Sequence, residues 1–99
     1  MTKLLDPILP GEILEEEFLK PFEISQSALA RNLGVSHRRI NEIIRGKRAI
    51  SPDTALRLAA YFGTSAEFWI NLQMTYELRL LKRKLGSSYS KIQHFSTAA

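Results

Sequence analysis

Apolar residues recur along this chain at helical spacing, three or four positions apart, and short polar breaks with serine, proline or glycine separate the runs. The alternation that marks β-strands between turns is missing from the pattern. The pattern therefore predicts an all-α domain. Five helices are expected, near residues 10–20, 26–33, 37–45, 52–63 and 64–85.

The expected helix boundaries coincide with residues that satisfy free backbone groups. Ser25, Ser36 and Ser51 stand where a helix needs an N-cap. Gly34 suits the left-handed conformation that ends many helices. The run 64–67, Thr-Ser-Ala-Glu, matches a capping box, so we expect the last and longest helix to begin there.

The apolar faces of the first and last two helices predict the core. On the first helix Glu15, Glu16 and Glu17 then form a solvated face. They are not paired catalytic carboxylates, because adjacent helical residues diverge by about 100° and cannot converge on one substrate atom. The residues expected in the core from these helices are Ile13, Leu14, Phe18, Leu19, Phe22, Leu56, Leu58, Phe62, Phe68, Trp69, Leu72 and Tyr76.

Residues 26–45 have the spacing of a helix-turn-helix. Ala30 supplies the small residue that is needed where two helices cross closely, and Gly34 suits a turn with positive φ. Val35 is then expected to pack into the core behind the turn. The apolar residues that complete the pattern are Leu29, Leu33, Ile40 and Ile43.

The second helix of this unit separates into a polar and an apolar face when it is projected at about 100° per residue. Arginine matches guanine O6 and N7, asparagine pairs with adenine, and histidine can donate or accept at a base edge. The polar face therefore predicts base reading in the major groove of DNA; an ordinary amphipathic helix with a solvated basic face is the alternative. Arg39 and Glu42 lie off this arc and face phosphate or only solvent. The base-reading candidates are His37, Arg38, Asn41 and Arg45, opposite Ile40, Ile43 and Ile44.

Contacts to DNA phosphate are expected on both sides of the recognition helix. Gln26 and Ser27 begin the preceding helix, whose free N–H groups and positive dipole end favour an anion. Lys47 and Arg48 follow the recognition helix. Such contacts set the register of the protein on DNA and carry no sequence information.

The last helix carries a second apolar stripe besides its core face. A helix with two apolar sides needs two partners, so we expect this stripe to form a homodimer contact. The alternative is that the tail folds back over it through Tyr89, Ile92 and Phe95. We expect residues 1–85 to form the DNA-binding domain and 86–99 a loosely held tail. The stripe consists of Ile70, Met74, Leu78, Leu81 and Leu85, with a 4-3-4 spacing over its last four members.

Composition narrows the function classes. The chain has 99 residues, 44% of them hydrophobic, which suffices for one core, and it has no cysteine, which excludes disulfides and thiolate zinc sites. Two histidines are too few for a histidine-rich metal site. No nucleophile constellation or glycine-rich phosphate loop supports an enzyme, so we expect no metal, cofactor or catalysis. No apolar run approaches the ~18–20 residues that span a bilayer, so we expect no membrane partner and a cytoplasmic location.

Charge is unevenly distributed along the chain. The formal net charge is +4. Residues 1–24 hold six acidic residues against two lysines, a net of −4, whereas residues 37–48 hold five arginines and lysines against one glutamate, a net of +4. So dense a basic block indicates polyanion binding, with a solvated cationic loop as the alternative.

Five segments carry a resemblance to a known family: LPGEIL at 9–14, the run from Ser25-Gln26 to Gly34, RGKRAIS at 45–51, TALRL at 54–58 and FWINLQ at 68–73. Together they resemble the HigA antitoxins, also called VapI-like, within the lambda-repressor-like (Xre) helix-turn-helix class. The match covers roughly residues 7–80. Leu9 departs from the family, which commonly has histidine before Pro-Gly, and the tail after Leu85 matches nothing.

The resemblance implies a dimeric antitoxin that binds a palindromic operator in double-stranded DNA, represses its own operon at the bacterial nucleoid and neutralises a HigB-type toxin, a ribosome-associated mRNA endonuclease. A stand-alone regulator without a toxin is the alternative, and both share every DNA-contact residue. Carried onto this chain, the family's DNA-contact positions are Gln26, Ser36, His37, Arg38 and Asn41, with Ser36 among the positioning residues, and its last-helix aromatic is Trp69.

Overall fold

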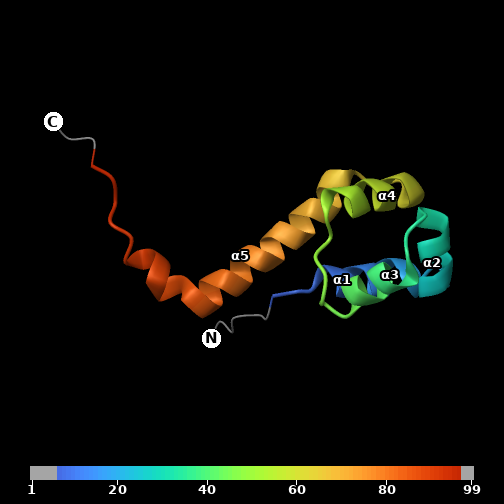
Figure 1. The fold of residues 1–99 in the computed structure, drawn as a ribbon, viewed down its shortest axis with the longest axis horizontal. Helices are drawn as coiled ribbons and strands as arrows, with labels where there is room; N and C mark the ends of the chain where they lie inside the picture. The colour runs from blue at the N-terminus through green and yellow to red at the C-terminus, as the bar shows by residue number, and fades with distance from the viewer. Residues whose placement is uncertain (1–6, 97–99) are drawn as a thin grey trace.

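The predicted all-α class is confirmed. The computed structural model describes residues 7–96, and that part of the chain holds five successive helices and no strand (Figure 1). The first helix has two parts, one α-helical turn and a π-helical continuation. The elements are α1 (Pro10–Ile13), η1 (Leu14–Leu19), α2 (Gln26–Leu33), α3 (His37–Ile44), α4 (Pro52–Phe62) and α5 (Ala66–Ser90).

The π-helical winding of η1 allows the first helix to bury residues five positions apart. The amide of Lys20 donates to the carbonyl of Glu15 over 2.9 Å, the hydrogen bond of a π-turn. Leu14 and Leu19 are both buried, although in an α-helix they would point about 140° apart. The wider winding therefore brings both leucines onto the core side, where they were expected, but through a π-turn that the sequence pattern did not predict.

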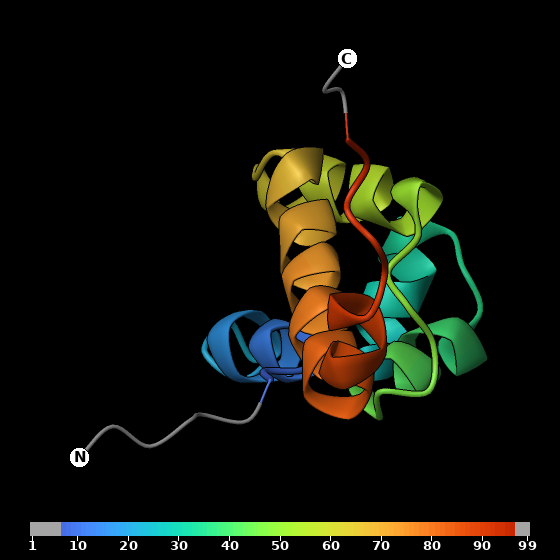
Figure 2. The ribbon, with the colours of Figure 1, turned by 90° about the vertical axis from the view of Figure 1, so that its left-hand side faces the viewer.

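All five helices contribute to the core, and its aromatic part lies where the first helix, α4 and the start of α5 meet. Leu14, Leu58 and Trp69 are completely buried. The ring of Phe18 lies 4.8 Å from that of Phe62 and 4.9 Å from that of Trp69, between ring centroids. Figure 2 shows α5 crossing one face of the bundle, beside the first helix and below α4. The predicted core is confirmed for these residues.

Three expected core residues are exposed: Phe22, Leu56 and Phe68, the last of which is 37% exposed although its ring contacts Trp69. Phe22 is 61% exposed, and only its ring edge approaches the aromatic cluster, 6.4 Å from Phe18 between centroids. Phe22 follows the end of η1, so the helical period that turns Phe18 toward the core does not extend to it. Leu56 is 63% exposed because α4 buries Ala55 and Leu58, and Leu56 points to the other side of that helix. The core prediction was wrong at these three positions.

The predicted serine caps are confirmed, and one cap is displaced by a residue. Ser25, Ser36 and Ser51 each accept a hydrogen bond from the backbone N–H three residues later. At the start of α5 the cap is Ser65 rather than the threonine of the expected capping box. The Thr64 hydroxyl instead accepts the indole N–H of the buried tryptophan over 2.7 Å, a partner that the capping pattern did not include.

α5 is longer than predicted. It continues past Gly86 to Ser90, although the backbone at Leu85 is not helical, with φ −127° and ψ 17°. Glycine disfavours a helix by only about 1 kcal/mol and no proline follows, so a further turn forms beyond the kink. Figure 1 shows the distal part of α5 and residues 91–96 running away from the other helices, which gives the described chain a longest dimension of 58 Å.

Candidate nucleic-acid interface

The helix-turn-helix is assembled by the turn between α2 and α3. Gly34 has φ 73° and ψ 33°, the left-handed conformation that glycine adopts without strain. The amide of Val35 then donates to the carbonyl of Ala30 over 3.0 Å, which closes the end of α2. Val35 itself packs against the core. This turn sets the crossing of the two helices as the sequence predicted.

α3 is buried on one side and open on the other. Ile40 and Ile43 are 0% and 1% exposed, and they attach the helix to the core. His37, Arg38 and Arg45 are exposed, and Asn41 is half-buried. The structure therefore brings the four base-reading candidates to the accessible side of one helix.

Asn41 connects α3 to the start of α2. Its side-chain N–H donates to Oε1 of Gln26 over 3.1 Å. The sequence assigned these two residues to base reading and phosphate positioning separately. The bond couples the orientation of the two side chains, and it leaves the Asn41 carbonyl and a second N–H for another partner.

Glu42 forms ion pairs with two of the candidate DNA-contact residues, Arg38 and Arg48. Its Oε2 accepts Nε–H of Arg38 over 2.9 Å, and its Oε1 lies 2.7 Å from Nη2 of Arg48. Hydrogen bonds from Arg38 and then Arg48 lower the pKa of Glu42, and Glu42 raises the pKa of Arg38. The sequence placed Glu42 toward phosphate or solvent; the i,i+4 spacing from Arg38 was the available signal for an ion pair.

Arg39 is turned toward α4. Its Nη1 lies 2.8 Å from Oδ2 of Asp53, and Asp53 also accepts Nε–H of Arg57 over 2.9 Å. These hydrogen bonds, the one from Arg39 first, lower the pKa of Asp53. Arg57 in turn donates to the carbonyl of Leu33 at the end of α2 over 2.8 Å. Arg39 thus belongs to a network that fixes α2, α3 and α4 together.

The remaining phosphate-positioning candidates are accessible. Ser27, Lys47 and Arg48 are exposed. Ser36 caps α3 by accepting the backbone N–H of Arg39 over 3.1 Å. Together with Gln26 they lie on the segments that precede and follow α3.

Gly11 positions the first helix against α3. The sequence indicated only that this glycine lies at the start of a helix. A Cβ atom there would fall 2.7 Å from Cα of Ile44 and closer still to the carbonyl oxygen of Ile43. The backbone of the first helix therefore touches the backbone of α3, and only glycine allows that approach. The sequence signal was a glycine inside the first helical turn, where glycine has no conformational advantage.

Gln73 is a second positioning residue that the sequence reasoning did not single out. It is 5% exposed, and its Oε1 accepts the backbone N–H of Ile50 over 2.8 Å. Its Nε2 donates to Glu77 over 2.9 Å. Both polar groups of the buried Gln73 side chain are therefore hydrogen-bonded. The bond to Ile50 attaches the loop that contains Lys47 and Arg48 to α5.

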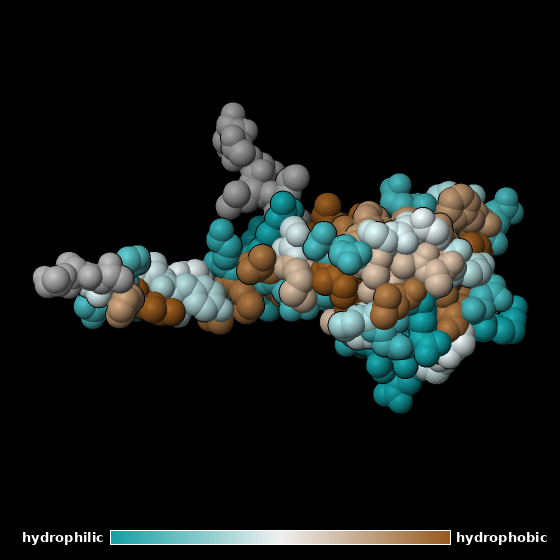
Figure 3. Space-filling model, turned by 90° about the horizontal axis from the view of Figure 1, so that it is seen from above, coloured by the Kyte–Doolittle hydropathy of each residue, from teal (hydrophilic) through white to brown (hydrophobic). Residues whose placement is uncertain are grey.

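The second apolar stripe of α5 is open. Ile70 packs partly against the core, whereas Met74, Leu78, Leu81 and Leu85 are 42–62% exposed. Tyr89, Ile92 and Phe95, expected to cover the stripe in the alternative view, are themselves 45–77% exposed. In the described part of the chain the tail therefore does not shield the stripe, and the alternative is wrong for residues 87–96. In Figure 3 hydrophobic residues recur along the arm that leaves the body of the molecule.

Residues 7–96 contain neither a metal-binding cluster nor a helix that could cross a membrane. In this part of the chain, histidine and acidic side chains do not gather in groups of three or more that could hold a metal ion. None of the described helices combines the length and apolar character needed to cross a membrane.

The comparisons with known proteins agree with this geometry. The family model described as helix-turn-helix matches residues 16–69. Virulence-associated protein I of Dichelobacter nodosus is 54% identical over 76 residues, which cover 77% of this chain and 70% of that protein.

Solved structures match over nearly the whole chain. The antitoxin HigA of Pseudomonas aeruginosa, solved with the higBA promoter, is 48% identical; the match covers 91% of this chain and 99% of that one, with a TM-score of 0.86. The antitoxin GraA in complex with its operator is 40% identical, with 98% and 99% covered and a TM-score of 0.87. This chain belongs to the helix-turn-helix family and, within it, to the HigA and VapI-like antitoxins.

Proposed function

We propose that this chain is a sequence-specific repressor that binds operator DNA through α3 and acts as the antitoxin of a toxin–antitoxin pair. The observation that carries the proposal is the open side of α3 and its C-cap, where His37, Arg38 and Arg45 are exposed and Asn41 is half-buried. Two relatives with the same fold were solved with a promoter or an operator, and both are named antitoxins. Its role is thus binding and not catalysis.

The protein acts as a homodimer on a palindromic operator. One helix-turn-helix reads only a few base pairs, and paired recognition helices bind half-sites about one turn of DNA apart. The open stripe of Met74, Leu78, Leu81 and Leu85 supplies an apolar contact for the second subunit. Residues 1–85 then form the DNA-binding domain, and 86–99 lie outside it.

The test of base reading compares three alanine variants on the DNA upstream of the chain's own gene. Arg38→Ala and Asn41→Ala should each cost about 1–3 kcal/mol at the cognate site and relax the preference at particular base pairs. Lys47→Ala is the matched control, because a lost phosphate contact weakens binding to all sequences alike and lowers the salt slope by about one. A uniform loss across sequences for Arg38→Ala and Asn41→Ala would refute the assignment.

The toxin partner is tested separately. The product of the neighbouring gene should co-purify with this chain, and co-expression should relieve its toxicity if that product is a HigB-type endonuclease. A chain that represses transcription but retains no such partner is a stand-alone regulator, and the antitoxin half of the proposal then fails while the DNA half stands.

A further inference from the structure

Glu42 is the one acidic residue in the basic block of residues 37–48, which also holds five arginines and lysines. Its side chain is 23% exposed, and on α3 it points about 40° from the direction of Arg38. A carboxylate thus lies at the edge of the base-reading set, where it repels phosphate and opposes binding to every DNA sequence alike. A DNA-binding surface gains no affinity from such a residue.

The two oxygens of Glu42 are divided between two arginines. Oε2 accepts Nε–H of Arg38 over 2.9 Å. Oε1 accepts Nε–H of Arg48 over 2.8 Å and lies 2.7 Å from its Nη2. Hydrogen bonds between a carboxylate and a guanidinium are charge-assisted and directional. One side chain therefore fixes an arginine on α3 and a second arginine on the loop that follows it.

The bond to Arg38 uses the inner edge of its guanidinium. The group has five N–H donors, and Nε contributes only one of them. The terminal amino groups Nη1 and Nη2 take no part in this bond, and the Arg38 side chain is 82% exposed. Two such groups match the O6 and N7 acceptors of guanine. The bond at Nε therefore leaves the end-on approach of Arg38 to a guanine unobstructed.

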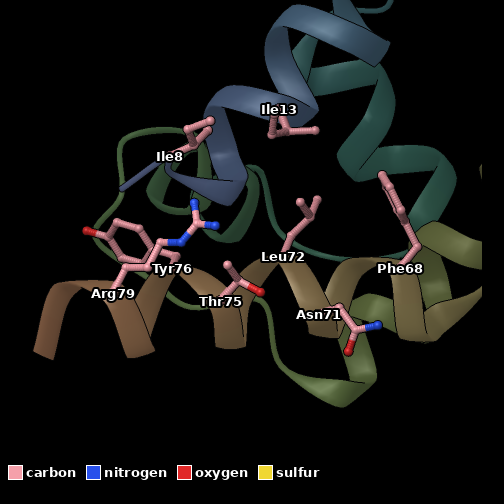
Figure 4. A pocket seen from close by; sticks show the side chains of 8 residues that line it. All are labelled: Ile8, Ile13, Phe68, Asn71, Leu72, Thr75, Tyr76 and Arg79. Atoms are coloured by element: carbon pink, nitrogen blue, oxygen red, sulfur yellow. The ribbon is translucent and has the colours of Figure 1, made fainter. Parts of the chain in front are cut away.

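No second acidic residue stands beside Arg48 among the described residues that line the neighbouring hollows. Arg48 lines a crevice of about 140 Å³ together with Gln73 and Tyr76 of α5. Tyr76 also borders a groove of about 270 Å³ between α5 and the first helix, where Figure 4 shows it beside Arg79. The charged residue of that groove is this arginine, another cation. Glu42 is thus the charged partner that fixes Arg48.

We propose that Glu42 is a positioning residue that sets the specificity of base reading, because it orders Arg38 for a guanine and ties it to Arg48. This role rests on the proposed DNA-binding function and adds to it a residue that does not itself contact a base. Ordering the arginine in advance removes part of the entropy cost of binding at the cognate site. At other sequences the ordering gives no gain, and the carboxylate repels phosphate. Glu42 therefore widens the difference between cognate and non-cognate affinity, which defines specificity.

A double-mutant cycle on operator DNA tests this role. The DNA is the segment upstream of the chain's own gene, together with copies changed at the base pair whose preference Arg38→Ala relaxes. Glu42→Gln keeps the side-chain length but has a single acceptor oxygen for two arginines. It should lower the preference for the cognate base pair about tenfold and raise the affinity for non-cognate DNA. In the Arg38→Ala background, the same substitution should change that preference by less than about twofold.

The matched control is Asp53→Asn. Asp53 also bridges two arginines, Arg39 and Arg57, so the control removes the same charge from the same kind of bridge. Neither arginine is a base-reading candidate. The control should therefore shift cognate and non-cognate affinity by the same factor and leave the base preference unchanged.

A second measurement needs no DNA. In isotope-labelled protein at mildly acidic pH, the Nε–H groups of Arg38 and Arg48 should each give a separate, slowly exchanging signal. Glu42 remains ionised there because the two arginines lower its pKa. In Glu42→Gln the Arg38 signal should lose this protection from exchange, and the rest of the spectrum shows that the variant is folded.

The outcomes distinguish this role from DNA binding itself. A uniform loss across sequences for Arg38→Ala removes base reading by Arg38 and the role of Glu42 with it. If Arg38→Ala relaxes the preference but Glu42→Gln does not, the role is overturned and base reading stands. An equal effect of Glu42→Gln in both backgrounds means that only its charge acts, which also overturns the role. Unchanged arginine signals in Glu42→Gln overturn it as well.

Discussion

The helix-turn-helix body and the distal arm of α5 differ in how far their side chains are buried and hydrogen-bonded. In the body, Trp69 is fully buried and its indole N–H has a partner, and no buried side-chain nitrogen or oxygen in the described residues lacks a hydrogen bond. In the arm, which comprises residues 78–96, six large apolar residues are 42–77% exposed: Leu78, Leu81, Leu85, Tyr89, Ile92 and Phe95. The body buries its apolar side chains within a single chain, whereas the distal part of α5 and the residues after it leave theirs open to solvent.

The strongest test of this difference replaces both central stripe residues with aspartate. Leu78→Asp with Leu81→Asp should give a folded monomer, because the new carboxylates would be buried without partners only in the dimer. Losing one of two linked half-site contacts should weaken operator binding by about 10²–10⁴-fold. Sedimentation and a DNA-binding titration measure both effects, while circular dichroism should show the helical content retained.

The matched control for that experiment is Leu56→Asp. Leu56 is as exposed as Leu78, 63% against 62%, but it lies on α4 and outside the stripe. It should leave both the dimer and DNA binding unchanged. If the stripe variant stays dimeric, the subunit contact lies elsewhere.

The same contrast explains what the sequence could predict. Helix boundaries at Ser25, Gly34, Ser36 and Ser51 depend on local backbone chemistry, and they agree with the structure to within a residue. The polar face of α3 follows from helical period alone. The predictions that were wrong depend on tertiary contacts. The helical period of apolar residues could not show that η1 winds as a π-helix or that Leu56 points outward.

The candidate site was predictable in its residue types but not in its internal bonds. That Glu42 pairs with both Arg38 and Arg48, and that Arg39 turns to Asp53, depends on the packing of α3 against neighbouring segments. Gly11 is a similar case, because its role is visible only once the backbone of Ile43 lies against it. A sequence pattern gives the faces of a helix, whereas the partner of each face comes from the fold.

A second prediction compares one large residue from each region. Trp69→Ala should lower the free energy of unfolding by about 3–5 kcal/mol, because it leaves a cavity in the core and removes the partner of Thr64. Leu81→Ala should change it by no more than about 0.5 kcal/mol at protein concentrations where the chain is monomeric. Urea denaturation at low and high protein concentration measures both, and a large, concentration-independent loss for Leu81→Ala would mean that the stripe belongs to the core.

A third prediction concerns the contact that positions the recognition helix. Gly11→Ala should destabilise the protein by about 1–3 kcal/mol, since the new methyl group meets the backbone of α3 and not a flexible side chain. DNA binding should weaken as well, because α3 must shift. Gly86→Ala is the control: among the described residues, nothing lies within 4 Å of the place its new methyl group would take, and alanine favours the helix there. Equal effects of the two substitutions on unfolding would contradict the close approach at Gly11.

The smallest expected effect is the acid sensitivity of the ion pairs around α3. The pKa of Glu42 is lowered by hydrogen bonds from Arg38 and Arg48, so the folded state holds this proton less tightly than the unfolded chain does. A group of this kind stabilises the fold above the ordinary glutamate pKa, about 4.3, and loses that contribution as the pH falls through its lower folded value. The pairs are exposed and screened by solvent, which keeps the effect small.

Glu42→Gln should therefore be less stable than the original chain near neutral pH, and the difference should shrink as the pH drops below about 4.3. Asp53, whose pKa is lowered by Arg39 and then Arg57, acts in the same direction, so acid unfolding persists in the single variant with a shallower slope. Denaturation curves at several pH values measure this. A stability difference that is constant from neutral to acid pH would show that Glu42 does not hold the two arginines in solution, and that the surface of α3 is arranged by packing alone.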